Sequence, residues 1–286
     1  MKESFEQNLN DKAEYGGIFS IQLLFKDSVG MPKKEDILSK LQKHVGNIDC
    51  ITYNENLAGF ACLEHIVHFE DGKAPAQLIL TACKEFSCDS IGEFEKSQMW
   101  NCDDSVLSEC KYQVLASDML AGGLPAKERA DFDSDFVEAL AEIYPECYAF
   151  YFKSSGKLFK AENIRNHNMT GLNRFVHFGV NARFFNIQGT EDMIVDTLGM
   201  NVLYMPDIQY HFKNMNPNWV VDHAYNMACY ILKNDNPIKD CETVGGILNG
   251  QMSSKVLWKC RYEMSLVQPS REVIDINMRE NSAGSR

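Results

Sequence analysis

The sequence lacks the short cysteine spacings and long apolar runs that identify several classes of protein. It holds ten cysteines but no C-x-x-C arrangement, so nothing supports a zinc ribbon, a thioredoxin-like redox motif or a disulfide framework. No apolar run approaches the roughly 18 to 20 residues that cross a bilayer. The opening residues MKESFEQNLNDKAEYGG are polar and acidic, unlike a signal peptide. We therefore expect a cytoplasmic protein with reduced thiols and no membrane partner.

Clusters of basic residues are also absent. The formal net charge is −12, and no run of five basic residues offsets it. Such a chain repels phosphate backbones, so a nucleic-acid partner is not expected. The remaining composition, 45% hydrophobic and 24% charged residues, is that of an ordinary globular chain with enough apolar surface for a core. A length of 286 residues fits one large domain or two smaller ones.

The catalytic motifs that short patterns reveal are missing. There is no G-x-x-x-x-G-K-[ST], no G-x-G-x-x-G after a strand, no G-x-S-x-G and no H-E-x-x-H. The Gly-Lys pair in SSGKLF lacks the rest of a phosphate loop, so we interpret it as a hairpin turn. His65 and His68 lie three positions apart on an expected strand and so point to opposite faces. We predict neither a metal site nor a cofactor.

What the sequence does contain is a mixture of strand and helix periodicity. Residues 18–26, IFSIQLLFK, alternate apolar and polar side chains as a strand does, and Leu24 breaks the alternation as an inner strand would. Helical spacing appears in residues 33–46 and 126–144. Another helix is expected from Asn216-Pro217, which provides an N-cap followed by proline at the first helical position.

The second half of the sequence has a longer irregular stretch between its strands. Residues 154–174 are polar and rich in Ser, Gly and Asn, which predicts a loop with at most one short helix near residues 160–164. The strand pattern resumes in FVHFGVNARFFNI, residues 175–187. The cleanest alternation, KVLWKCRYEMSLV at 255–267, leads through the turn QPSR into EVIDINM, a C-terminal hairpin.

These elements predict an α+β protein built from open, mainly antiparallel sheets with helices packed on one face. The order β-α-β-β-α-β across residues 18–119 matches a split βαβ unit, which leaves two ferredoxin-like sandwich units as a further alternative. We expect a disordered segment at 1–16, an N-terminal α+β unit at 17–123, a C-terminal α+β unit at 124–278 and a disordered tail at 279–286.

The most polar strand pattern lies in residues 196–212, DTLGMNVLYMPDIQYHF. Asp207, Gln209 and His211 share one face of the expected strand, and the apolar residues between them face the core. Neighbouring members lie about 6.6 Å apart and the outer pair about 13 Å, so Asp207 and His211 do not both bind one metal ion directly. Two interpretations stay open: a solvated strand face, or a face that contacts a ligand.

The full set of candidate residues draws on other parts of the chain. The candidate ligand-contacting residues are Asp196, Asp207, Gln209, His211, Asp240 and Arg271. Without a nucleophile, metal or phosphate motif, we expect a non-catalytic binding or interaction module with a protein or small-molecule partner. The alternative is a hydrolase-type enzyme that uses this Asp/Gln/His cluster. A self-associating homo-oligomer that uses edge strands, Trp219 or Trp258 is a third interpretation.

Four segments together resemble a bacterial domain family of unknown function, DUF4261. They are VNARFFNI (180–187), DTLGMNVLYMPDIQYHF (196–212), DCETVGG (240–246) and LWKCRYEMSLVQPSREVIDIN (257–277). The most specific parts are D-T-L-G-M, P-D-x-Q and P-x-R-x-V-x-D, and the similarity spans about residues 180–278. The resemblance implies an intracellular bacterial protein. It brings no catalytic residues to this sequence.

Overall fold

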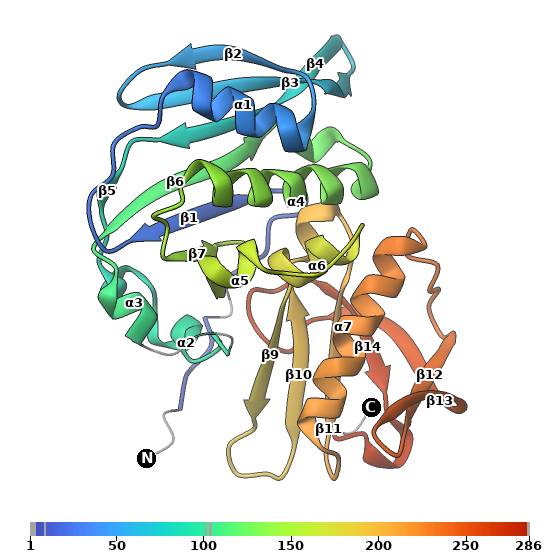
Figure 1. Cartoon of the computed structure of the whole chain (residues 1–286). Helices are drawn as coiled ribbons and strands as arrows, with labels where there is room; N and C mark the ends of the chain where they lie inside the picture. The colour runs from blue at the N-terminus through green and yellow to red at the C-terminus, as the bar shows by residue number, and fades with distance from the viewer. Residues whose placement is uncertain (1–3, 9, 101, 103–104, 285–286) are drawn as a thin grey trace. The chain divides into compact units, whose positions relative to one another are not determined.

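Backbone hydrogen bonds group the strands into two separate sheets (Figure 1). The computed structural model describes residues 4–8, 10–100, 102 and 105–284. One unit runs from Gly16 to Gly179, and the other combines the segment up to Tyr15 with the chain from Val180 onward. The units therefore divide at 179/180 instead of 123/124, because β7 (Ala149–Phe152) pairs with β1 (Ser20–Phe25) and so belongs to the first sheet.

The sheet of the first unit follows the order β2-β3-β4-β6-β1-β7-β8, with the short β5 beside β6, and its strand pairs are antiparallel. Its other strands are β2 (Ile48–Tyr53), β3 (Leu57–Phe69), β4 (Gly72–Thr81), β5 (Lys84–Glu85), β6 (Tyr112–Met119) and β8 (Lys157–Lys160). The predicted α+β class with open, mainly antiparallel sheets is confirmed. The inner position of β1, which the apolar Leu24 indicates, is also confirmed, because β6 and β7 flank this strand.

The strand order of this unit departs from a ferredoxin-like sandwich. In a split βαβ unit, the two strands that a helix connects are parallel, and a third strand lies between them in the sheet. Here β4 and β6 pair directly and antiparallel. The chain between them contains the 3₁₀ turn η1 (Cys88–Ser90) and the short helices α2 (Glu93–Lys96) and α3 (Ser105–Glu109). This segment covers the sheet instead of crossing it, because its apolar side chains pack around Leu24.

The long helices of the first unit pack on one face of its sheet, and the short helix α3 adds a contact with the opposite face at β1. The longer helices α1 (Lys34–Val45) and α4 (Ala126–Ile143) lie side by side on one face (Figure 1). The Phe25 ring packs 5.7 Å from that of Tyr144, directly after α4. Leu24 points the opposite way and packs against α3, because successive side chains of a strand alternate between faces.

The irregular stretch after β7 is more structured than the sequence predicts. The SSGKLF turn is confirmed as the β7–β8 hairpin, and α5 (Ala161–Arg165) lies close to the expected short helix. Residues 175–179, predicted as strand, belong instead to α6 (Asn173–Gly179). The aromatic residues that suggest a strand there fill the core from a helix, as Phe175 does 5.8 Å from Phe19.

The second unit has the strand order β12-β13-β14-β11-β10-β9. Its strands are β9 (Asn181–Asn186), β10 (Met193–Leu198), β11 (Asp207–Phe212), β12 (Thr243–Leu248), β13 (Gln251–Met264) and β14 (Glu272–Asn277). The β11–β14 pair is parallel, and the other pairs are antiparallel. The predicted hairpin of β13 and β14 is present.

One long helix, α7 (Pro217–Lys233), packs on this sheet. The predicted start is confirmed, since the Asn216 side chain accepts a hydrogen bond from the Asn218 amide at 3.0 Å and Pro217 follows it. Tyr210 faces this helix from β11 and bonds the imidazole of His223 at 2.6 Å. In the part of the chain that the structure describes, no helix has both the length and the apolar character needed to span a membrane.

Both chain ends contain ordered residues, contrary to the two expected disordered segments. Lys12 forms a bridge with Ser270, and the Ala13 amide donates to the Ser270 carbonyl at 3.1 Å. After β14, the turn η4 (Arg279–Asn281) leads to Ala283, whose amide donates to the His211 carbonyl at 3.0 Å. These backbone bonds to a sheet and its loops provide the order that composition alone does not predict. Residues 1–3, 9, 285 and 286 of those segments lie outside the described residues.

Trp258 packs directly over a glycine of the neighbouring strand. Its side chain is only 1% exposed, and a Cβ atom added at Gly246 would lie 2.6 Å from Trp258 Cε2. A tryptophan this deeply buried offers no surface for self-association, which corrects that part of the oligomer interpretation. Trp219, by contrast, is 40% exposed.

We expect Gly246→Ala to lower the free energy of unfolding by about 1–3 kcal/mol, because the methyl group overpacks the Trp258 ring. Urea titration followed by tryptophan fluorescence measures the change. Gly30→Ala is the matched control, since nothing lies within 4 Å of its added Cβ, and it should change stability by less than about 0.5 kcal/mol. Equal effects of the two substitutions would contradict the packing described.

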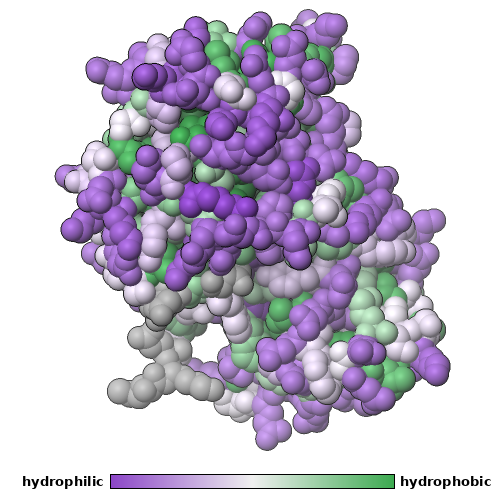
Figure 2. Space-filling view, viewed as in Figure 1, coloured by the Kyte–Doolittle hydropathy of each residue, from purple (hydrophilic) through white to green (hydrophobic). Residues whose placement is uncertain are grey.

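A charged cluster connects α1 to α4, two helices that lie under a largely hydrophilic surface in the view of Figure 2. Glu142 lies 3.2 Å from Lys40 Nζ, 2.5 Å from Lys43 Nζ and 2.9 Å from His44 Nε2. Hydrogen bonds from Lys43 and then His44 lower the pKa of Glu142 to about 2. A carboxyl group whose pKa is depressed on folding stabilises the fold above its ordinary pKa and loses that effect as the pH falls.

Glu142→Gln should therefore lower the free energy of unfolding by about 1 kcal/mol at pH 6, a partly screened value because the side chain is 30% exposed. The difference from the wild type should narrow as the pH falls from about 4.5 to about 2. Urea titrations across this range provide the test. Glu146→Gln, an exposed control, should show no such pH dependence; a Glu142→Gln difference that stays constant would sink the prediction.

Candidate functional site

Three of the six candidate residues, Asp196, Asp207 and Arg271, meet in a buried ionic network on the second sheet, and a fourth, Gln209, lies opposite Asp196 in the strand register. Arg271 Nε lies 2.9 Å from Asp207 Oδ2, and Arg271 Nη2 lies 2.7 Å from Asp196 Oδ2. Asp196 also accepts from Arg183, whose Nε lies 2.9 Å from Oδ1. The Asp196 and Asp207 side chains are at most 1% exposed. The ionic network is therefore shielded from solvent.

Arg271 uses its whole guanidinium group within this network. Beyond the two carboxylates, it donates to the carbonyl oxygens of Thr197 at 2.6 Å, Pro269 at 2.8 Å and Val267 at 3.2 Å. An arginine has five N–H donors, and each of them has an acceptor here. The loop of residues 265–270 thereby closes over β10 and β11, which explains why the face is buried.

The Asp207 carboxylate accepts hydrogen bonds from three donors. Thr197 Oγ1 donates to it at 3.0 Å and the Met200 amide at 3.2 Å, in addition to Arg271. Burial raises the pKa of Asp207, while Arg271 and the Met200 amide act in the opposite direction. This carboxylate has the environment of a structural anchor.

Gln209 extends the polar arrangement to the next strand. Its Nε2 donates to Asp275 Oδ1 at 2.9 Å, and its Oε1 accepts from the Leu266 amide at 2.6 Å. The strand register places Arg183, Asp196, Gln209 and Asp275 opposite one another in a row across β9, β10, β11 and β14. Arg183, Thr197 and Asp275 are network members that the sequence prediction missed.

The other two candidates lie apart from the network. His211 Nε2 is 3.4 Å from Asp192 Oδ2, near the far end of β11, and its side chain is 15% exposed. Asp240 is exposed and accepts from the Tyr262 amide at 3.0 Å, a bond that lowers the pKa of Asp240. Neither contacts Arg271. Among the described residues, no group of three His, Cys, Asp or Glu side chains is placed to hold a metal ion.

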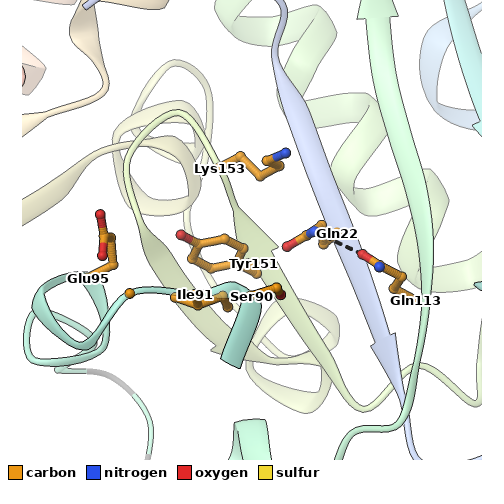
Figure 3. A pocket seen from close by; sticks show the side chains of 8 residues that line it. Gln22, Ser90, Ile91, Glu95, Gln113, Tyr151 and Lys153 are labelled. Carbon is orange, nitrogen blue, oxygen red and sulfur yellow. Dashed lines mark hydrogen bonds between the residues drawn. The ribbon is translucent and has the colours of Figure 1, made fainter. Parts of the chain in front are cut away.

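A hollow of about 300 Å³ lies on the first sheet, where strands β6, β1 and β7 run side by side (Figure 3). It is lined by Gln22, Ser90, Ile91, Gly92, Glu95, Gln113, Tyr151 and Lys153. Gln22 and Tyr151 are directly opposite each other on β1 and β7. The segment of η1 and α2 forms the remaining wall.

A chain of hydrogen bonds fixes the orientation of the Gln22 amide. Gln113 Nε2 donates to the Glu85 carbonyl at 3.2 Å, so its Oε1 faces Gln22 and accepts from Gln22 Nε2 at 2.8 Å. The two ends of an amide differ in hydrogen-bonding role, and a backbone carbonyl accepts only. Gln22 Oε1 therefore points toward Tyr151 (Figure 3), where it is buried without a donor among the described residues.

Tyr151 places an unused hydroxyl group at the hollow. Its side chain is 7% exposed, yet its Oη has no hydrogen-bond partner among the described residues. Burial, with a smaller contribution from Glu95, raises the pKa of Tyr151 to about 12, so the phenol stays protonated at neutral pH. No sequence signal marks Gln22 or Tyr151, because the two residues are 129 positions apart and each sits in an ordinary strand.

A second hollow, of about 510 Å³, lies in the second unit between α7 and the β12–β13 hairpin. Trp219, Ile247 and Met252 contribute its apolar wall, and Asp222 and Asn226 contribute polar groups. None of the residues of the Arg271 network lines either hollow.

One family model matches part of the chain. It is described as "Domain of unknown function (DUF4261)" and matches residues 196–277, from the start of the Asp196 motif to the end of β14. The searches of curated proteins and of solved structures returned no match. The expected resemblance of the C-terminal region is thereby confirmed.

We expect Arg271→Met to lower the free energy of unfolding by about 3–5 kcal/mol, because it leaves Asp207 buried without a cation. Lys259→Met, which removes an exposed cation from β13, is the control and should change stability by less than about 0.5 kcal/mol. Urea titration followed by tryptophan fluorescence reports both. A loss below about 1 kcal/mol for Arg271→Met would show that the network does not hold the sheet.

Proposed function

Because the chain carries a DUF4261 domain at residues 196–277, a family described without an activity, we propose a function from the side chains themselves. The protein is a non-catalytic binding module, and the hollow on its first sheet takes a small polar molecule. The observation that carries this proposal is the Tyr151 hydroxyl, which belongs to a side chain only 7% exposed and has no partner among the described residues. Because Tyr151 lines the hollow, a molecule that occupies the hollow can bond this hydroxyl in place of water.

The neighbouring amide supports the same interpretation. Gln22 Oε1 has a fixed orientation and no donor, and an unsatisfied buried acceptor costs roughly 1–3 kcal/mol. A protein built only for stability would gain by replacing such groups with apolar ones.

The polar network of the second unit gives little support to the hydrolase alternative. Catalysis by a carboxylate needs a group that is free to take up or release a proton near a bound substrate. The Asp196 and Asp207 carboxylates are instead engaged by Arg183, Arg271 and Thr197. The proposal therefore assigns these residues to the framework.

The setting of the protein is part of the same proposal. A bacterial, cytoplasmic setting is proposed from the sequence resemblance to DUF4261 and from the ten cysteines, which are free thiols. The net charge of −12 supports a partner other than nucleic acid.

Tyr151→Phe tests the proposal because it removes only the unpartnered hydroxyl. We expect the affinity for a bound polar molecule to fall about three- to tenfold, the effect of one lost hydrogen bond, with stability unchanged within about 0.5 kcal/mol. Ligand-observed NMR with mixtures of sugars, polyols, nucleosides and amino acids identifies binders, and calorimetry measures their affinities.

Tyr112→Phe, on β6 and outside the lining of the hollow, is the matched control and should bind as the wild type does. If no compound in these mixtures binds, or if every binder is indifferent to Tyr151→Phe, the proposal fails.

A further inference from the structure

The hollow on the first sheet carries one charge of each sign. Lys153 directly follows β7 and is two positions after Tyr151. Because side chains alternate between faces along an extended chain, both point to the face that carries the hollow. Glu95 comes from α2 on the opposite side of Tyr151 (Figure 3). Two separate elements thus bring a cation and an anion to the same small volume.

Both charged groups are exposed to solvent, and neither forms an ion pair among the described residues. In contrast, Lys96 pairs with Glu93 at 2.6 Å, one residue to either side of Glu95. Glu95 and Lys153 do not pair with each other either, so more than 4 Å separates the lysine nitrogen from the carboxylate oxygens. The gap between them is the hollow itself.

Building on the proposed binding function, we propose that the ligand is a small zwitterion with a protonated amine at one end and a carboxylate at the other, as in an ω-amino acid or a dipeptide. The amine faces Glu95, the carboxylate faces Lys153, and the Tyr151 hydroxyl bonds the part between them. Charge-assisted hydrogen bonds of this kind are about twice as strong as neutral ones.

The charge of the whole protein favours such a ligand over a simple anion. A net charge of −12 repels anions at long range, whereas a zwitterion has no net charge to repel. Within the hollow, a simple anion can bond only Lys153 and a simple cation only Glu95, so each singly charged analogue makes one of the two charge-assisted contacts that a zwitterion makes. The volume of about 300 Å³ lies at the lower end of small-molecule sites, which suits a compact ligand.

A series of ω-amino acids from glycine to 6-aminohexanoate, together with Gly-Gly and Ala-Ala, provides a set of probes of graded length. Isothermal titration calorimetry with the full chain should give the tightest binding at one length, the length that spans the gap. For that probe, the analogues that lack either the amine or the carboxylate should bind at least tenfold more weakly.

Charge-removing variants assign the two ends of the ligand. Lys153→Met should weaken the best zwitterion about tenfold and leave the affinity for its carboxylate-free amine unchanged. Glu95→Gln should also weaken the best zwitterion about tenfold, but it should leave the affinity for the amine-free acid unchanged. Lys111→Met and Glu55→Gln, exposed residues outside the hollow, are the matched controls, and circular dichroism verifies that every variant folds.

The outcomes separate this inference from the proposed function. If neutral polyols or nucleosides bind in a manner that depends on Tyr151 while the zwitterions do not, the binding function stands and the zwitterion assignment is overturned. The assignment is equally overturned if zwitterions bind but neither charge-removing variant weakens them. If no compound of either group binds, both proposals fail.

Discussion

The second unit depends on a guanidinium group buried beyond the reach of water. Arg271 is 1% exposed, and its acceptors come from β10, from β11 and from its own loop. An unpaired charge in this position would cost several kcal/mol, so only a strand arrangement that delivers all of its acceptors is tolerated. We interpret the network as a device that fixes register, including the one parallel strand pair of this sheet, more than as a source of net stability.

This interpretation explains what the DUF4261 motifs encode. The first aspartate of D-T-L-G-M is Asp196, P-D-x-Q contains Asp207 and Gln209, and P-x-R-x-V-x-D contains Arg271 and Asp275. Each of these side chains belongs to the buried polar arrangement. The residues that carry the resemblance within the matched segment therefore specify how the strands of this unit fit together. The polar hollow lies in the first unit, outside the matched segment.

Local signals in the sequence predicted local structure well. Alternation located β1 and β13, the Asn216-Pro217 cap located the start of α7, and the apolar side of β11 does face a core. The alternation of apolar and polar residues does not show whether the polar side of β11 is exposed to water. That side is buried because Arg271, 64 positions further along the chain, covers Asp207. The unit boundary, the β4–β6 pairing and the hollow likewise depend on contacts between distant segments, which periodicity does not record.

The pairing of Lys12 and Ala13 with Ser270 makes the first unit an insertion within the chain of the second. During synthesis, all strands of the first unit, residues 16–179, emerge from the ribosome before those of the second unit. The segment that contains Lys12 and Ala13 can pair with Ser270 only after the loop before Arg271 has been synthesised. A fragment cut to residues 196–277 would lack both this segment and Arg183. The backbone at Ser270 would then lose its partners at Lys12 and Ala13, and the Asp196 carboxylate would lose one of its two arginines.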